Sequence, residues 1–183
     1  MSKNLEREFA LHCSPALCGI KPSNLVSLSI RDFDIEKEVL ELNKKFGPRI
    51  CFRIMKKEED RCLILIYRTK LLEKTLFNED TMMFLKKEGY PYIKDIEALL
   101  DCLEIRMITN QEFPHEIGVF LGYDLSDVLH FINKDKRCIH TGYWKVYSDL
   151  ELKLEIFNRY TKCRDCVIRL LNRGYSIENF MRV

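Results

Sequence analysis

The sequence predicts an α+β fold, in which a small, mostly antiparallel sheet of about three strands is covered by several helices. Two short segments rich in β-forming residues, "RICFRIM" and "CLILIYR", flank the charged turn "KKEEDR" and predict a hairpin. A third such segment, "GYWKVY", predicts the third strand, and most of the remaining chain has helical apolar spacing. The length suits a single globular domain, residues 1–183.

In the first half of the chain, residues 2–11 are predicted to form a helix. A loop over "CSPALCGIKPSNL" follows, because two prolines and a glycine interrupt the pattern. A second helix begins at Asp34, repeats apolar residues along one face and ends at Gly47. "CLILIYR" is apolar at nearly every position, which predicts a central strand covered on both faces.

Helices dominate the second half of the chain. Three of them are predicted at residues 70–77, at 79–88 after the N-cap Asn78, and at 95–107. "IGVFLG" continues one or two turns, Gly122 is a left-handed terminator, and "LSDVLHFI" is the next helix. The longest helix spans 149–172, where Ser148 and Glu151 fit a capping box.

Composition and charge exclude several classes of function. The 30 basic and 28 acidic side chains give a net charge of +2 and are interspersed, whereas nucleic-acid binding favours a clustered basic surface. No apolar run approaches the ~20 residues of a membrane span, and charges occupy the place of a signal-peptide core. We therefore expect a cytoplasmic protein that binds neither nucleic acid nor membrane.

The eight cysteines predict free thiols in a reducing compartment, most of them serving as small apolar residues. Cys163 and Cys166 share one helix face and are a weak candidate for half of a zinc site, completed by Cys138 and His140. A redox pair favours a helix N-terminus, and this pair lies well inside its helix. Core packing is the favoured interpretation; metal binding and redox chemistry remain alternatives.

The segment "FPHEIG" is the first candidate site. Pro114 suits a first helical turn, where the helix dipole stabilises the carboxylate of Glu116. His115, as a general acid or base, and Glu116 beside it are candidate catalytic residues, although a structural histidine is the commoner case. Val119 excludes the H-E-x-x-H zinc motif. Gly118 would allow a ligand or another backbone to come close.

Other candidates lie in two further segments. His12 and Cys13 are a candidate base and nucleophile, and Lys21 in the same loop is a candidate anion-binding residue. In "GYWKVY", alternation places Tyr143 and Lys145 on one face, where they are candidate ligand-binding residues. The same alternation places Trp144 and Val146 in the core.

Taken together, "HCSPALCGIKPSNL", "FPHEIGVFLGYDLSDV" and "GYWKVY" resemble the bacterial domain-of-unknown-function family numbered 3793, found largely in anaerobes. The resemblance runs from about Phe9 to Tyr175. It implies a cytosolic protein whose distinctive residues lie in these three segments. It implies no activity and no cofactor, and the family pattern has a small residue in place of Cys18.

Two hypotheses follow. The favoured one is a small binding or accessory protein, which holds an unidentified ligand or protein partner in a cleft near "CSPALCGIKP", "FPHEIG" and "GYWKVY". The alternative is an enzyme that uses Cys13 as nucleophile and His12 or His115 as base.

Overall fold

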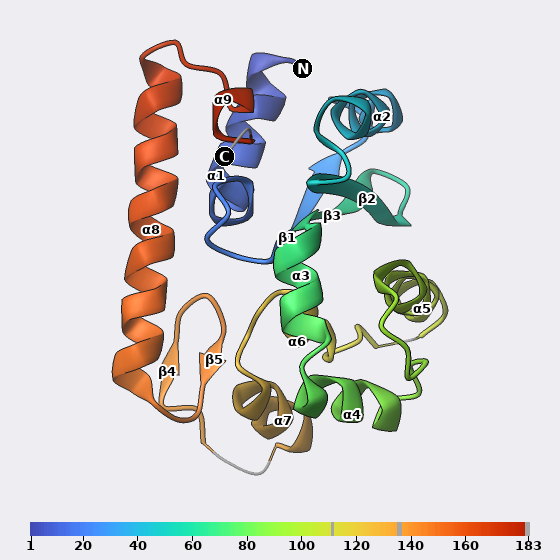
Figure 1. Cartoon of the computed structure of the whole chain (residues 1–183). Coiled ribbons are helices and arrows are strands. Elements are labelled where there is room, and N and C mark those ends of the chain that lie inside the picture. The colour runs from blue at the N-terminus through green and yellow to red at the C-terminus, as the bar shows by residue number, and fades with distance from the viewer. Residues whose placement is uncertain (111, 135–136, 182–183) are drawn as a thin grey trace. The chain divides into compact units, whose positions relative to one another are not determined.

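A computed structural model describes residues 1–110, 112–134 and 137–181 (Figure 1). It confirms the α+β class, since helices accompany a three-stranded antiparallel sheet and a separate two-stranded one. The chain divides into two compact units. Unit 1 comprises Met1–Leu72 and Lys162–Val183, and unit 2 comprises Glu73–Thr161. Helices α3 (Thr69–Leu76) and α8 (Leu150–Asn172) carry the chain from one unit into the other.

Unit 1 contains the three-stranded sheet, whose order is β1-β3-β2. The strands are β1 (Ser23–Ser29), β2 (Ile50–Lys57) and β3 (Arg61–Arg68). The predicted hairpin of β2 with β3 is confirmed, and so is the central position of β3. Ile64 and Leu65, which point to opposite faces of the sheet, are both fully buried. Both faces of β3 are therefore covered, as its apolar sequence predicted.

The third strand of the sheet is β1, and the prediction that "GYWKVY" would supply it was wrong. Only Lys145–Val146 of that segment forms a strand, β5, which pairs with β4 (His140–Thr141) in a separate hairpin. Strand β1 pairs with β3 along its whole length and places Val26 and Leu28 in the core. Its alternation of serine with apolar residues was a strand signal, but it directly follows the prolines and glycine that predicted a loop.

Helix α1 (Lys3–Leu17) continues through much of the predicted loop, past Pro15. Proline removes a backbone donor from the helix and disturbs its last turn. Residues distant in the sequence satisfy that turn: the Asn24 side chain accepts a hydrogen bond from the Ala16 amide at 3.2 Å, and Arg68 Nε donates to the Ala16 carbonyl at 3.1 Å. These partners explain why the helix extends beyond its predicted end.

The remaining helices of the structure lie close to their predicted positions. Asn78 caps its helix as predicted, because its side chain accepts hydrogen bonds from the Asp80 and Thr81 amides. Gly122 has the predicted left-handed conformation, with a φ of +71°. The bounds are α2 Ile35–Phe46, α4 Glu79–Lys87, α5 Ile96–Thr109, α6 Ile117–Phe120, α7 Leu125–Asn133 and α9 Glu178–Met181.

The core of unit 1 lies between one face of the sheet and helices α1, α2 and α9, with the C-terminal half of α8. Phe9 of α1 packs on Phe52 of β2, with ring centroids 5.8 Å apart. Unit 2 contains α4, α5, α6 and α7, the β4–β5 hairpin and the N-terminal half of α8. The pocket described next lies in unit 2.

Candidate functional site

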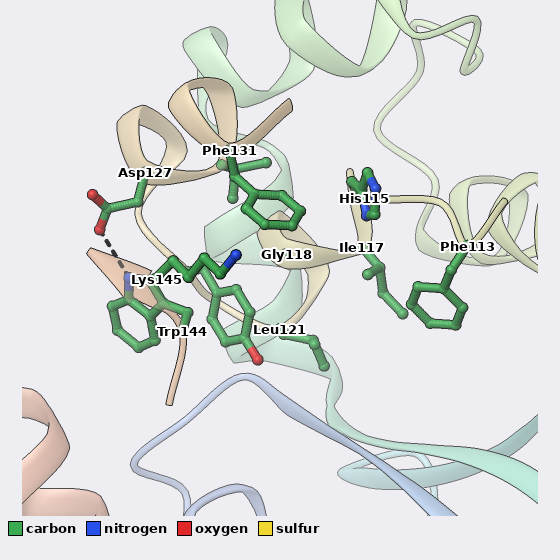
Figure 2. Close-up of a pocket in the computed structure, with 11 residues that line it drawn as sticks. Phe113, His115, Ile117, Gly118, Leu121, Asp127, Phe131, Trp144 and Lys145 are labelled. Carbon is green, nitrogen blue, oxygen red and sulfur yellow. Dashed lines mark hydrogen bonds between the residues drawn. The ribbon is translucent and has the colours of Figure 1, made fainter. Parts of the chain in front are cut away.

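Unit 2 contains a cavity of about 340 Å³, lined by the "FPHEIG" segment, α6, α7 and β5 (Figure 2). This volume lies near the lower end of the roughly 300–1,000 Å³ typical of small-ligand sites. Four aromatic residues form much of its wall: Phe113, Tyr123, Phe131 and Trp144. Aliphatic side chains such as Ile117, Leu121 and Val128 fill the spaces between them. Flat apolar faces therefore dominate the cavity.

Gly118 allows α6 and α7 to pack closely enough to form this wall. A Cβ at this position would lie 2.7 Å from Val128 Cγ2 and 3.1 Å from the Tyr123 ring. Asp124 then begins α7 as its N-cap, accepting a hydrogen bond from the Ser126 amide at 2.9 Å. The close approach expected at Gly118 is thus to neighbouring side chains of the same unit.

Trp144 is held on three sides. Its indole stacks on Tyr123 with centroids 4.8 Å apart, and Phe157 meets it edge-on at 4.5 Å. Its Nε1 donates to Asp127 Oδ2 at 2.8 Å (Figure 2). The other oxygen of Asp127 accepts from the Tyr147 amide at 2.8 Å. One side of the cavity is therefore a fixed aromatic plane.

Behind this wall lies Lys153, whose side chain is 1% exposed. Its Nζ lies 3.4 Å from Asp124, 3.7 Å from Asp127 and 3.5 Å from Asp149. Burial opposes ionisation of Asp124, but hydrogen bonds from Ser126 and the charge of Lys153 outweigh it and lower the pKa of that carboxyl. Lys153 thus places one buried positive charge among three carboxylates beneath the pocket.

Lys145 and His115 are ionisable residues at the mouth of the cavity. The ammonium of Lys145 lies 5.1 Å from the Phe131 centroid, and the His115 ring meets Phe131 edge-on at 4.9 Å. Figure 2 shows Phe131 between the end of Lys145 and His115. Both side chains are solvent-exposed, so a ligand can reach them. The cavity thus combines apolar planes with nitrogen donors.

Glu116, predicted beside His115, does not line the cavity. It is 3% exposed, and its Oε1 accepts hydrogen bonds from Arg106 Nε at 2.5 Å and from the Tyr90 hydroxyl at 3.1 Å. Burial, together with the Glu116 charge, raises the pKa of Tyr90, so its phenol stays a hydrogen-bond donor. Glu116 therefore anchors the start of α6 to α5.

His12 and Cys13 lie on α1 and not in the predicted loop. The His12 side chain is 55% exposed and lies 3.7 Å from Glu8, whereas Cys13 is fully buried. Burial raises the pKa of the Cys13 thiol, which favours the unreactive protonated form. His115 belongs to unit 2 and Cys13 to unit 1. This geometry favours a packing role for Cys13.

Lys21 is also buried, with 3% exposure, and follows the end of α1. Burial lowers its pKa to about 8, and a negative charge on the nearby Cys13 would act in the opposite direction. A lysine this inaccessible is poorly placed to receive a ligand from solvent. Instead, the titration of Lys21 makes the stability of unit 1 depend on pH.

We expect the free energy of unfolding to depend on Lys21 above about pH 8. Between this value and the ordinary 10.5, the folded state has released a proton that the unfolded state still holds, so stability increases with pH. The Lys21 contribution should grow by about 1 kcal/mol over roughly the first pH unit. The raised pKa of Cys13 acts in the opposite direction above 9.0.

Urea denaturation of the wild type and of Lys21→Met across this pH range measures the effect. Because Lys21 and Cys13 interact, the Lys21 effect is taken from the difference between the two profiles below pH 9.0, before the Cys13 thiol ionises in the unfolded chain. Exposed Lys87 supplies the matched control, Lys87→Met, which should follow the wild type. Parallel profiles for the wild type and Lys21→Met would contradict the assignment.

The remaining candidates lie elsewhere. The Tyr143 hydroxyl is 3.3 Å from Thr161 Oγ1, and its ring meets Tyr160 edge-on at 5.3 Å, so it packs against α8. Cys163 is half-buried and hydrogen-bonded to Cys18, and Cys166 is exposed. The thiol of Cys138 donates to the His140 carbonyl at 2.9 Å. Within residues 1–110, 112–134 and 137–181, no group of three or more metal-ligating side chains is placed to hold an ion.

Sequence reasoning placed candidates in two of the segments that line the cavity, but it missed the aromatic wall. It assigned Trp144 to the core and gave Tyr123 and Phe131 no role. An available signal was the density of aromatic residues between Phe113 and Trp144. That pattern alone does not distinguish a pocket wall from ordinary core packing, because both need the same side chains.

Comparison with known proteins identifies the family of the chain. The family model described as "Protein of unknown function (DUF3793)" matches residues 9–181, and the resemblance seen in the sequence is thereby confirmed. No curated protein and no solved structure matches the chain. Among the helices that the structure describes, none has both the length and the apolar composition needed to cross a membrane.

Proposed function

Because the chain belongs to this DUF3793 family of unknown function, its own site must indicate its role, and we propose that it binds a small, flat organic anion in the unit 2 cavity. The observation that carries the proposal is the Lys145 ammonium above the Phe131 ring, at the mouth of an aromatic cavity. An apolar cavity with few polar groups is the usual design of a small-ligand site.

The charges around the cavity favour an anion. Lys145 and His115 offer nitrogen donors, whereas both oxygens of Asp127 accept hydrogen bonds from the protein and Lys153 lies 3.7 Å from this carboxylate. A carboxylate or sulfonate on the ligand would meet Lys145 in a charge-assisted hydrogen bond. Its ring would lie against the aromatic wall, which favours flat molecules over branched ones.

Binding is favoured over the alternative of catalysis by a cysteine nucleophile. Such an enzyme needs an accessible thiol that ionises readily beside a base. Cys13 is fully buried and has a raised pKa. The eight free thiols fit a reducing compartment and support our placement of the protein in the cytoplasm.

Trp144 provides the test, because it is the chain's single tryptophan and lies in the cavity wall. The probes are 2-naphthoate, neutral 2-naphthalenemethanol and cationic 2-naphthylmethylamine, which share one ring system and differ in charge. We expect the affinity to fall in that order, by calorimetry and by Trp144 emission. Equal affinities, or tightest binding of the cation, would contradict the proposal.

Lys145→Met keeps the length of the side chain and removes its charge. We expect it to weaken 2-naphthoate binding about tenfold, the loss of one charge-assisted hydrogen bond, and to leave 2-naphthalenemethanol unaffected. Lys87→Met, an exposed lysine on α4, is the matched control and should bind like the wild type. Equal losses in both variants would show that Lys145 attracts the anion only through overall charge.

A further inference from the structure

Unit 1 contains a pair of thiols that the cavity does not use. Cys18 caps the C-terminal end of α1, Cys163 lies within α8, and the two side chains are hydrogen-bonded to each other. We propose that Cys18 and Cys163 are a site of reversible oxidation, which hydrogen peroxide converts into a disulfide. The bond would join two segments far apart in the sequence.

The contact between the thiols is held by the surrounding packing. Both cysteines are half-buried, and both pack against the hydrophobic core of unit 1. Cys163 is also neighboured along α8 by the exposed Cys166, one helical turn further on. The helix fixes the spacing between Cys163 and Cys166, whereas Cys18, at the end of α1, is hydrogen-bonded to Cys163 through its side chain.

The two thiols have different chemical roles. The hydrogen bond from Cys163 lowers the pKa of Cys18 against the opposing effect of burial, and the Arg68 guanidinium acts in the same direction. The same hydrogen bond, with burial, raises the pKa of Cys163. Cys18 is therefore the better nucleophile, and Cys163 is the neighbour that resolves its oxidised form.

The reaction has two steps. The Cys18 thiolate attacks one oxygen of the peroxide: an S–O bond forms, the O–O bond breaks, and the hydroxide that leaves takes a proton from solvent to become water. The Cys163 sulfur then attacks the sulfenic sulfur of Cys18. The S–S bond forms, the S–O bond breaks, and water departs with the proton of Cys163. Two thiols are oxidised by two electrons, and one peroxide is reduced to two waters.

The disulfide would close a covalent loop that contains the whole of unit 2, since Glu73–Thr161 lies between the two cysteines in the sequence. Closing so long a loop restricts the unfolded chain and raises the Tm of the oxidised protein. A thiol reductant would restore the original Tm. Reversal by reductant distinguishes this disulfide from overoxidation to sulfinic acid.

The test uses the full chain, reduced and then treated with hydrogen peroxide. We expect the intact mass to fall by two hydrogen atoms. After alkylation of the remaining thiols, trypsin should release residues 8–31 linked to the dipeptide 163–164, because cleavage at Arg164 separates Cys163 from Cys166. Fragmentation of the longer peptide should place the link on Cys18 and leave Cys13 alkylated.

Three variants sharpen the result. Cys18→Ala and Cys163→Ala should each lose the linked peptide and the rise in Tm, whereas Cys166→Ala should keep both. A link between Cys163 and Cys166 would overturn the proposal. It would also be overturned if peroxide oxidised Cys18 irreversibly while Cys163 remained a free thiol that could be alkylated. The same holds if Cys18 reacted with peroxide no faster than the exposed Cys166.

Discussion

Asp127→Ala is expected to lower the free energy of unfolding by about 3–5 kcal/mol and to abolish 2-naphthoate binding. The change removes the carboxylate that accepts hydrogen bonds from the buried indole Nε1 of Trp144 and from the Tyr147 amide. Among the described residues, it also removes one of three carboxylates within 4 Å of Lys153, whose side chain is 1% exposed. Because a domain is stable by only about 5–15 kcal/mol, this is a large fraction of the total.

Urea denaturation measures the loss, and Trp144 emission reports the state of the cavity wall. Asp127→Asn retains one carbonyl acceptor and should cost less than Asp127→Ala, but it should still destabilise because Lys153 loses a counter-charge. Asp165→Ala removes an exposed carboxylate that pairs with Arg164, and it should change stability by less than about 0.5 kcal/mol. If Asp127→Ala matched this control, Asp127 would have no part in holding the wall.

Sequence patterns were reliable where the physical cause is local. The apolar run of β3 predicted a buried central strand, since a strand covered on both faces has no polar side to show. Asn78 predicted the start of a helix correctly, because its side chain accepts hydrogen bonds from amides only two and three residues away. Such interactions can be read directly from neighbouring positions.

Sequence patterns failed where distant residues decide the outcome. The end of α1 depends on Asn24 and on Arg68, which lies 52 positions from the Ala16 carbonyl that it reaches. Pro15 and Gly19 predicted a loop because the sequence pattern does not show these partners. The same loop prediction hid β1, whose identity as a strand depends on pairing with β3. Tertiary contacts therefore outweighed local propensity in this part of the chain.

Two ionisable residues that line the cavity were candidates from the sequence, and its aromatic walls were not. His115 was chosen for its imidazole chemistry and Lys145 for its place in the alternation of a predicted strand, which are both local features of the sequence. The cavity itself depends on Gly118 meeting Val128 and on the Asp127 bond to Trp144. Neither contact has a sequence signature, since each joins segments that only the fold brings together.

Glu116→Ala is expected to lower the free energy of unfolding by about 3 kcal/mol, the lower part of the range for a broken buried ion pair. The estimate is at the lower end because the Arg106 side chain is 27% exposed and can turn toward water, whereas that of Glu116 is 4% exposed. The Tyr90 hydroxyl would lose its acceptor as well. Urea denaturation at neutral pH measures the change.

A comparison of variants separates charge from hydrogen bonding at Glu116. Glu116→Gln keeps an acceptor for Tyr90 and removes the negative charge beside Arg106, so it should cost about 1–2 kcal/mol. The double variant Arg106→Met/Glu116→Gln should cost less than the sum of its two single changes, because no uncompensated charge is left.

Since Glu116 precedes α6 directly and His115 precedes Glu116, loss of this anchor should also weaken 2-naphthoate binding. Full stability with weakened binding would instead mean that Glu116 positions His115 without supporting the fold.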